Sequence, residues 1–219
     1  MSDFARIRAL VFDLDGTLVD SYDAIAQSLN HACSRLGERP LPPEKVRLMV
    51  GRGLEQLVRD VLGEERVEAG VRLFREHYAE VYAEGTFPLP EASETLSGLR
   101  QRGYRMAVAS NKPARFSEAI LAGFDMLSYF DSVEGPDTSC VTKPDPAMLR
   151  RCLRAMEVDE EEALYIGDMV LDVETAGRAG VPVILVPGGS SPEQELRSTG
   201  KPVLRSLAGL LELLQGATF

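Results

Sequence analysis

The fold is indicated by one stretch of the chain, residues 8–18, which reads RALVFDLDGTL. Its first half is a short apolar run, typical of a strand that is buried on both faces of a sheet. Its second half is a polar turn, in which Asp13 and Asp15 lie two residues apart and Gly16 permits a sharp change of backbone direction. Because ligands of open parallel sheets bind beyond the carboxyl ends of the strands, we expect these carboxylates to lie in a binding site.

The rest of the chain alternates strand signals with helical patterns. Further strands are predicted at 105–110, 130–133, 163–166 and 181–186. Helices are predicted at 91–103, 114–122, 146–156, 172–179 and 206–215. Gly123 and Gly180 stand where glycines that end helices are common. This alternation predicts an α/β fold with a Rossmann-like parallel sheet that is covered by helices on both faces.

The segment 21–85 interrupts the alternation. Its apolar residues recur at helical spacing and no convincing strand occurs in it, so it is too long to be a bare connection. We expect an all-helical cap domain at 21–85, inserted into a core that is formed by residues 1–20 and 86–219.

The composition disfavours several classes of protein. The 219 residues are 44% hydrophobic and carry a net charge of -10, which argues against binding to nucleic acid or to an anionic membrane. No stretch approaches the roughly 20 apolar residues of a membrane span. Three cysteines without CxxC spacing predict neither a disulfide framework nor a zinc site. We expect a cytoplasmic protein, monomeric or homodimeric.

Polar residues also occur in three later segments. Ser110 and Asn111 end the second predicted strand, where a hydroxyl and backbone amides can hold phosphoryl oxygens. Lys143 precedes a helix and can neutralise a phosphoryl group. Asp168 and Asp172 follow the fourth strand and offer the oxygen ligands that Mg²⁺ prefers. Each segment alone could be a helix cap, a surface lysine or a turn. Their joint occurrence favours one site.

The motifs resemble those of a known superfamily. DLDGT at 13–17, SNK at 110–112, KPDP at 143–146 and GDMVLD at 167–172 resemble, in order, the four motifs of the haloacid dehalogenase-like hydrolases. The resemblance covers the whole chain, including a helical cap after the first motif. Within the superfamily, VGRGLEQLV at 50–58 is most similar to phosphoglycolate phosphatases. The resemblance implies a Mg²⁺-dependent phosphatase for a small phosphorylated metabolite, with 2-phosphoglycolate the leading candidate.

The resemblance also implies roles for the matching residues. Asp13 would attack phosphorus to form an aspartyl-phosphate, and Asp15 would protonate the leaving alcohol and then activate water. Ser110 would bind the phosphoryl group, while Lys143 would stabilise the nucleophile and the developing charge. The Mg²⁺ ligands would be Asp13, the main-chain carbonyl of Asp15 and Asp168, with Asp172 in support.

Three further residues are predicted to contact the substrate, namely Thr17, Arg52 and Asn111. Arg52 lies between two glycines of the insert and can pair with a substrate carboxylate as the cap closes, although a solvated arginine in a flexible turn is an equally good interpretation. Met169 departs from the family pattern, which often has serine there, so one hydrogen bond beside the metal is missing or is replaced by water.

Two alternatives stay open at this point. A β-phosphoglucomutase-like enzyme, or another sugar-phosphate enzyme, would share the core motifs and differ mainly in the cap. A binding module could retain the fold without catalysis, although the intact aspartates argue against it. Dehalogenation is disfavoured because that chemistry lacks an acid at the position of Asp15. His31 and His77 lie in the insert and are expected to be packed or exposed residues rather than the general base.

Overall fold

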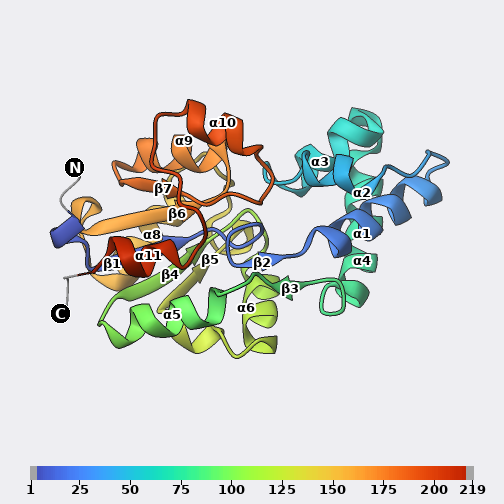
Figure 1. Ribbon diagram of the computed structural model, residues 1–219. Helices are drawn as coiled ribbons and strands as arrows, with labels where there is room; N and C mark the ends of the chain where they lie inside the picture. The colour runs from blue at the N-terminus through green and yellow to red at the C-terminus, as the bar shows by residue number, and fades with distance from the viewer. Residues whose placement is uncertain (1–3, 216–219) are drawn as a thin grey trace.

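The computed structural model describes residues 4–215 and contains a parallel sheet with helices on both faces (Figure 1). The strands lie in the order β5-β4-β1-β6-β7, and every neighbouring pair is parallel. Their bounds are β1 Ala9–Phe12, β4 Arg105–Ala109, β5 Ser132–Glu134, β6 Ala163–Gly167 and β7 Val183–Leu185. The predicted α/β fold with a parallel sheet is confirmed, and the strand ends fall within two residues of the predicted ends.

Alternating residues of each strand face two different helical layers. In β1, Leu10 and Phe12 pack into one hydrophobic cluster, whereas Ala9 and Val11 pack into the other. The first layer contains α5 (Ala92–Gln101), α6 (Ala114–Gly123) and α11 (Gly209–Leu213). The second contains α8 (Ala147–Met156), α9 (Val170–Ala179) and α10 (Glu193–Ser198), and the short α7 (Pro136–Ser139) follows β5. Because both faces are covered, the strands are apolar almost throughout.

Four helices lie to one side of the sheet and share a hydrophobic cluster of their own (Figure 1). They are α1 (Tyr22–Arg35), α2 (Pro43–Arg47), α3 (Leu54–Leu62) and α4 (Val67–Val81). Leu29, Val58 and Phe74 are buried among them. The periodicity of the insert therefore predicted its helices, and we keep residues 21–85 as our interpretation of the cap domain.

A small antiparallel ribbon joins these helices to the rest of the molecule. It pairs β2 (Val19–Asp20) with β3 (Phe87–Pro88), so both crossings of the chain run side by side. Two-residue strands give no periodic signal, and Pro88 disfavours a strand prediction. The sequence therefore did not predict the ribbon.

The ends of the helices differ from the predicted ends by up to three residues. The last helix begins at Gly209 rather than at Ser206, because successive amides there bond to the third preceding carbonyl in tight turns. Gly123 is the last helical residue of α6 and does not adopt the left-handed conformation, whereas Gly180 ends α9 with φ of 81°, as predicted. No helix within residues 4–215 is long and apolar enough to cross a membrane.

Candidate active site

The predicted polar residues meet at the carboxyl edge of three adjacent strands. Asp13 directly follows β1, while Ser110 and Asp168 directly follow its neighbours β4 and β6. The backbone amide of Asp13 continues the ladder by donating to the carbonyl of Ile166, at 2.8 Å. The sheet thus fixes the starting points of three motifs that are far apart in the sequence.

Three buried carboxylates form the centre of the site. Oxygen atoms of Asp13, Asp168 and Asp172 lie within 4.8 Å of one another. Burial, with the charges of the two other carboxylates, raises the pKa of Asp168 well above its ordinary value. Burial also raises the pKa of Asp172, although Lys143 opposes this increase. Burial therefore disfavours the ionised forms of Asp168 and Asp172 unless positive charge lies nearby.

Lys143 supplies part of that charge. Its Nζ lies 2.7 Å from an oxygen of Asp13 and 2.8 Å from an oxygen of Asp172. Burial alone would lower the pKa of Lys143, but the two carboxylates hold it well above its ordinary value. The hydroxyl of Tyr165, which donates to the carbonyl of Ala109 at 3.0 Å, is a further neighbour of this ammonium. Lys143 is therefore a buried cation shared by the two carboxylates.

The donor set fits a magnesium ion. One lysine faces three carboxylates, so a further cation would offset the remaining charge, and all candidate ligand atoms are oxygens. Asp168 is also held in place, because it accepts hydrogen bonds from the hydroxyl of Thr17 at 3.1 Å and from the amide of Ser190 at 2.7 Å. Such outer contacts are typical of metal-binding carboxylates.

Two glycines let the backbone approach Asp168. Gly16 has φ of 81°, and a Cβ there would lie 2.7 Å from an oxygen of Asp168, so the glycine predicted for the sharp turn is required. A Cβ on Gly189 would collide with the same carboxylate. Gly189 lies in a segment of glycines and serines without a family motif, and the sequence did not distinguish it from a loop glycine.

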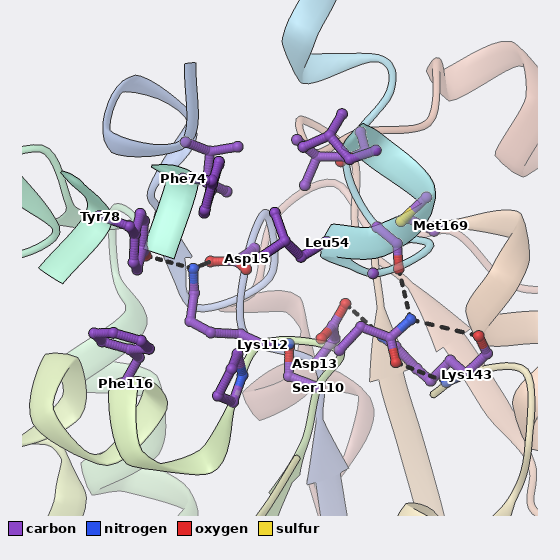
Figure 2. A pocket seen from close by; sticks show the side chains of 18 of the residues that line it. Asp13, Asp15, Leu54, Phe74, Tyr78, Ser110, Lys112, Phe116, Lys143 and Met169 are labelled. Carbon is purple, nitrogen blue, oxygen red and sulfur yellow. Dashed lines mark hydrogen bonds and ion pairs between the residues drawn. The ribbon is translucent and has the colours of Figure 1, made fainter. Parts of the chain in front are cut away.

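Asp15 is held by a second buried lysine that the sequence did not single out. Its carboxylate lies 3.0 Å from Nζ of Lys112 and accepts a hydrogen bond from the hydroxyl of Ser21. The same ammonium donates to the hydroxyl of Tyr78 on α4, at 2.7 Å (Figure 2). Burial alone would lower the pKa of Lys112, but Asp15 and Tyr78 raise it above its ordinary value. The lysine is part of the SNK motif, whereas no sequence signal points to Tyr78.

A cavity opens between the carboxyl edge of the sheet and the helices of the insert (Figure 2). Asp13, Asp15, Ser110 and Lys143 all line it, so the residues predicted to be catalytic are together. Apolar side chains line much of the remaining wall, which we call the roof; they are Ile25, Leu54, Leu57 and Phe74 of the insert, the ring of Tyr78, and Phe116 of α6, and Arg75 and Arg115 lie beside them. The site therefore combines a charged floor with an apolar roof.

The three residues predicted to contact the substrate have different surroundings. Thr17 is fully buried and uses its hydroxyl on Asp168 instead of lining the cavity. Asn111 lines the cavity, but its side-chain amide donates to the carbonyl of Gly51 at 2.8 Å and its oxygen accepts from the amide of Lys143 at 2.6 Å. Arg52 is exposed and is not among the described residues that line the cavity. The glycines on either side of it, Gly51 and Gly53, line the cavity instead.

Met169 has two structural roles where the family often has serine. Its backbone amide donates to Asp172 at 2.9 Å, which closes the first turn of α9. Its side chain lines the cavity and packs so closely on Gly51 that a Cβ there would overlap the thioether. The missing hydroxyl is thus replaced by an apolar contact with the insert.

Fold and site together define a hydrolase of a known class. The chain matches the family model of the haloacid dehalogenase-like hydrolases over residues 10–186, and it belongs to that family. A solved haloacid dehalogenase-like hydrolase of Bacteroides fragilis matches the structure with a TM-score of 0.86 at 26% identity, covering 93% of this chain and 99% of that chain.

Curated relatives narrow the class. A phosphoglycolate phosphatase of Aquifex aeolicus is 37% identical over 179 residues, which are 82% of this chain and 84% of that protein. Phosphoglycolate phosphatase 1 of Pseudomonas aeruginosa is 38% identical over 183 residues, which are 80% of this chain and 67% of that protein. The chain is a phosphatase of this family and is similar to phosphoglycolate phosphatases.

Proposed function

We propose that this phosphatase hydrolyses small phosphomonoesters with Mg²⁺ and an aspartyl-phosphate on Asp13, and that 2-phosphoglycolate is its leading substrate. The observation that carries the proposal is the position of Asp13, which faces the cavity beside Asp15 and touches both Lys143 and the acidic cluster. One of its oxygens pairs with Lys143, and the other accepts from the amide of Leu14 at 2.8 Å. The nucleophile is therefore held in a fixed orientation.

The residues divide the two steps of hydrolysis between them. Asp13 attacks phosphorus, the ester P–O bond breaks, and the leaving oxygen takes the proton of Asp15. Water then attacks the phosphorus of the aspartyl-phosphate, Asp15 takes the proton of that water, and inorganic phosphate leaves Asp13. Lys143 and the hydroxyl of Ser110 stabilise the charge that develops on the phosphoryl oxygens.

The metal would be held at the acidic cluster. Its ligands would be Asp13, the main-chain carbonyl of Asp15 and Asp168, with Asp172 in support, and when bound it supplies positive charge next to the phosphate. The hydroxyl of Thr17 and the backbone amide of Ser190 already hold one of these ligands, Asp168, in position.

The apolar roof favours a small leaving group over a sugar. A hexose would bury several hydroxyls against side chains such as Leu54, Phe74 and Phe116, which offer no hydrogen-bond partners. This argues against the β-phosphoglucomutase-like alternative. The intact site argues against a non-catalytic binding module, and the similarity to phosphoglycolate phosphatases supports 2-phosphoglycolate. The cytoplasmic location and the monomeric or homodimeric state remain predictions.

A phosphate-release assay tests the proposal. With Mg²⁺ we expect hydrolysis of 2-phosphoglycolate in preference to hexose phosphates, and loss of that activity in EDTA. Asp13→Asn should have no measurable turnover, because an amide is a poor nucleophile. Asp15→Asn should lose about 10²–10⁴-fold in kcat, for want of proton transfer.

Asp125→Asn is a matched control, since Asp125 is exposed and asparagine tolerates its left-handed backbone. Substantial turnover by Asp13→Asn would contradict the covalent mechanism. Full activity in EDTA would contradict the proposed requirement for a metal ion, and a preference for hexose phosphates would contradict 2-phosphoglycolate as the leading substrate.

A further inference from the structure

Lys112 is a buried cation on the leaving-group side of the cavity. It lines the cavity beside Asp15, which under the proposed function protonates the leaving oxygen. Its side chain is only 5% exposed, and the apolar residues Phe74 and Phe116 line the same cavity. A charge in such surroundings interacts strongly with any anion that enters, because little water screens it.

The contacts of Lys112 leave one of its three N–H groups weakly used. Asp15 and the hydroxyl of Tyr78 take two of them, at 3.0 and 2.7 Å. For the third, the acceptor among the described residues is the hydroxyl of Ser21, 3.5 Å away, which is at the long limit of a hydrogen bond. This ammonium can therefore accept a further anionic partner without losing its two short contacts.

The other cations near the cavity are less suited to a substrate anion. Lys143 is already shared by two carboxylates of the floor. Arg75 is half exposed and pairs with Glu55 at 2.8 Å. Arg115 is exposed and lies over the ring of Phe116. Arg52, which the sequence singles out, is exposed and outside the cavity lining.

We propose that Lys112, held by Tyr78 of the cap, binds the carboxylate of an acidic leaving group and so selects phosphorylated hydroxy acids over neutral phosphoesters. This inference rests on the proposed function. In 2-phosphoglycolate only two carbon atoms separate the ester oxygen from the carboxylate oxygens. An ester oxygen next to Asp15 therefore places the carboxylate next to the ammonium that pairs with Asp15. Tyr78 fixes that ammonium from α4, so a cap residue sets the specificity.

Two matched ligands that cannot be hydrolysed test this inference. 3-Phosphonopropionate has the shape and charge of 2-phosphoglycolate, and propylphosphonate replaces its carboxylate with a methyl group. The affinity of both is measured by calorimetry with Mg²⁺, in the parent and in Lys112→Met, Tyr78→Phe, Arg52→Ala and the surface control Lys45→Met. The parent should bind the carboxylate ligand more tightly. In Lys112→Met that preference should fall about ten- to a hundredfold, the value of a hydrogen bond to a charged group.

Tyr78→Phe keeps the ring in the hydrophobic cluster and removes only the hydroxyl, so the preference for the carboxylate ligand should fall severalfold. This variant tests the inference independently if Lys112→Met does not fold. The inference would be overturned if the Lys112 and Tyr78 variants lost affinity equally for both ligands, or if their preference for the carboxylate ligand were unchanged. So would a selective loss in Arg52→Ala alone. A parent that hydrolyses phosphomonoesters but shows no preference for the carboxylate refutes this inference only, whereas a parent without any hydrolysis refutes the proposed function.

Discussion

Asp168 shows how single neighbouring residues prepare a site for its ligand. A buried carboxylate of raised pKa needs both a cation and fixed donors, and the hydroxyl of Thr17 is one of those donors. The sequence predicts Thr17 as a substrate contact because it belongs to the first motif. The side chain instead points at Asp168, since Thr17 is fully buried below the cavity. A substitution of Thr17 should therefore change the affinity for Mg²⁺ rather than the binding of the substrate.

We expect Thr17→Val to raise the Mg²⁺ concentration for half-maximal activity by about 10–100-fold, because a lost outer hydrogen bond weakens a metal site by this much. Thr17→Ser keeps the hydroxyl and should stay close to the parent. Activity is measured against Mg²⁺ concentration at saturating substrate. If Thr17→Val changes the KM for the substrate and leaves the Mg²⁺ dependence as it was, then Thr17 contacts the substrate after all.

Several of the residues that the sequence could predict directly follow strands in family motifs. Asp13, Ser110 and Asp168 are of this kind, because strand order alone brings them to one edge. Tyr78 and Gly189 could not be predicted, since their roles depend on how the helices of the insert and a late loop approach the sheet. Nothing local in the sequence distinguishes such a tyrosine from the other aromatic residues that pack in the insert.

At the scale of the element, α4 has two different faces. Tyr78 faces the cavity, while the preceding His77 stacks on His31 of α1, with ring centroids 4.5 Å apart. Nδ1 of His77 lies 3.1 Å from the hydroxyl of Ser28, also on α1. The position of Lys112 therefore depends on how α4 is packed against α1. The 3.6-residue periodicity predicted both helices, but not which residues of one would contact the other.

The contact between α1 and α4 should be sensitive to pH. Burial, with the nearby His31, lowers the pKa of His77 below its ordinary value of 6.5. The unfolded chain then binds more protons than the folded chain just below pH 6.5, so the free energy of unfolding decreases as pH falls through this range. The stabilising contribution is complete above pH 6.5. We expect the parent to lose more stability between pH 7.5 and 5.5 than His77→Gln does, as measured by denaturant unfolding at both values. Equal losses would show that another group causes the change.

At the scale of the whole molecule, the helices of the insert and the layers around the sheet are joined by more than the β2–β3 ribbon. The hydroxyl of Tyr22 on α1 lies 2.9 Å from that of Ser190 in the core, and Arg47 on α2 donates to the carbonyl of Gly188. Asn111 joins the turn at Gly51 to the loop of Lys143. The sequence predicted a cap but could not predict these contacts, because each joins residues that are far apart in the sequence.

Asn111 should therefore control the docking of the cap turn. Asn111→Asp keeps an oxygen that can accept from the amide of Lys143, but it loses the donor to the carbonyl of Gly51. A lost hydrogen bond of about 1 kcal/mol corresponds to a roughly fivefold larger population of the opened turn. We expect hydrogen exchange at Met49 and Val50, whose amides bond within this turn, to accelerate by that factor.

Asn30 provides a matched control for this prediction, because its side-chain amide also makes two backbone bonds, to Leu41 within the insert. Asn30→Asp should accelerate exchange at Leu41 and leave the turn at Val50 as in the parent. The two variants make the same chemical change, so a difference between their exchange maps must come from where each amide lies. If Asn111→Asp leaves the turn as protected as in the parent, then Met169 and the ribbon are sufficient to hold the cap, and Asn111 serves only the loop of Lys143.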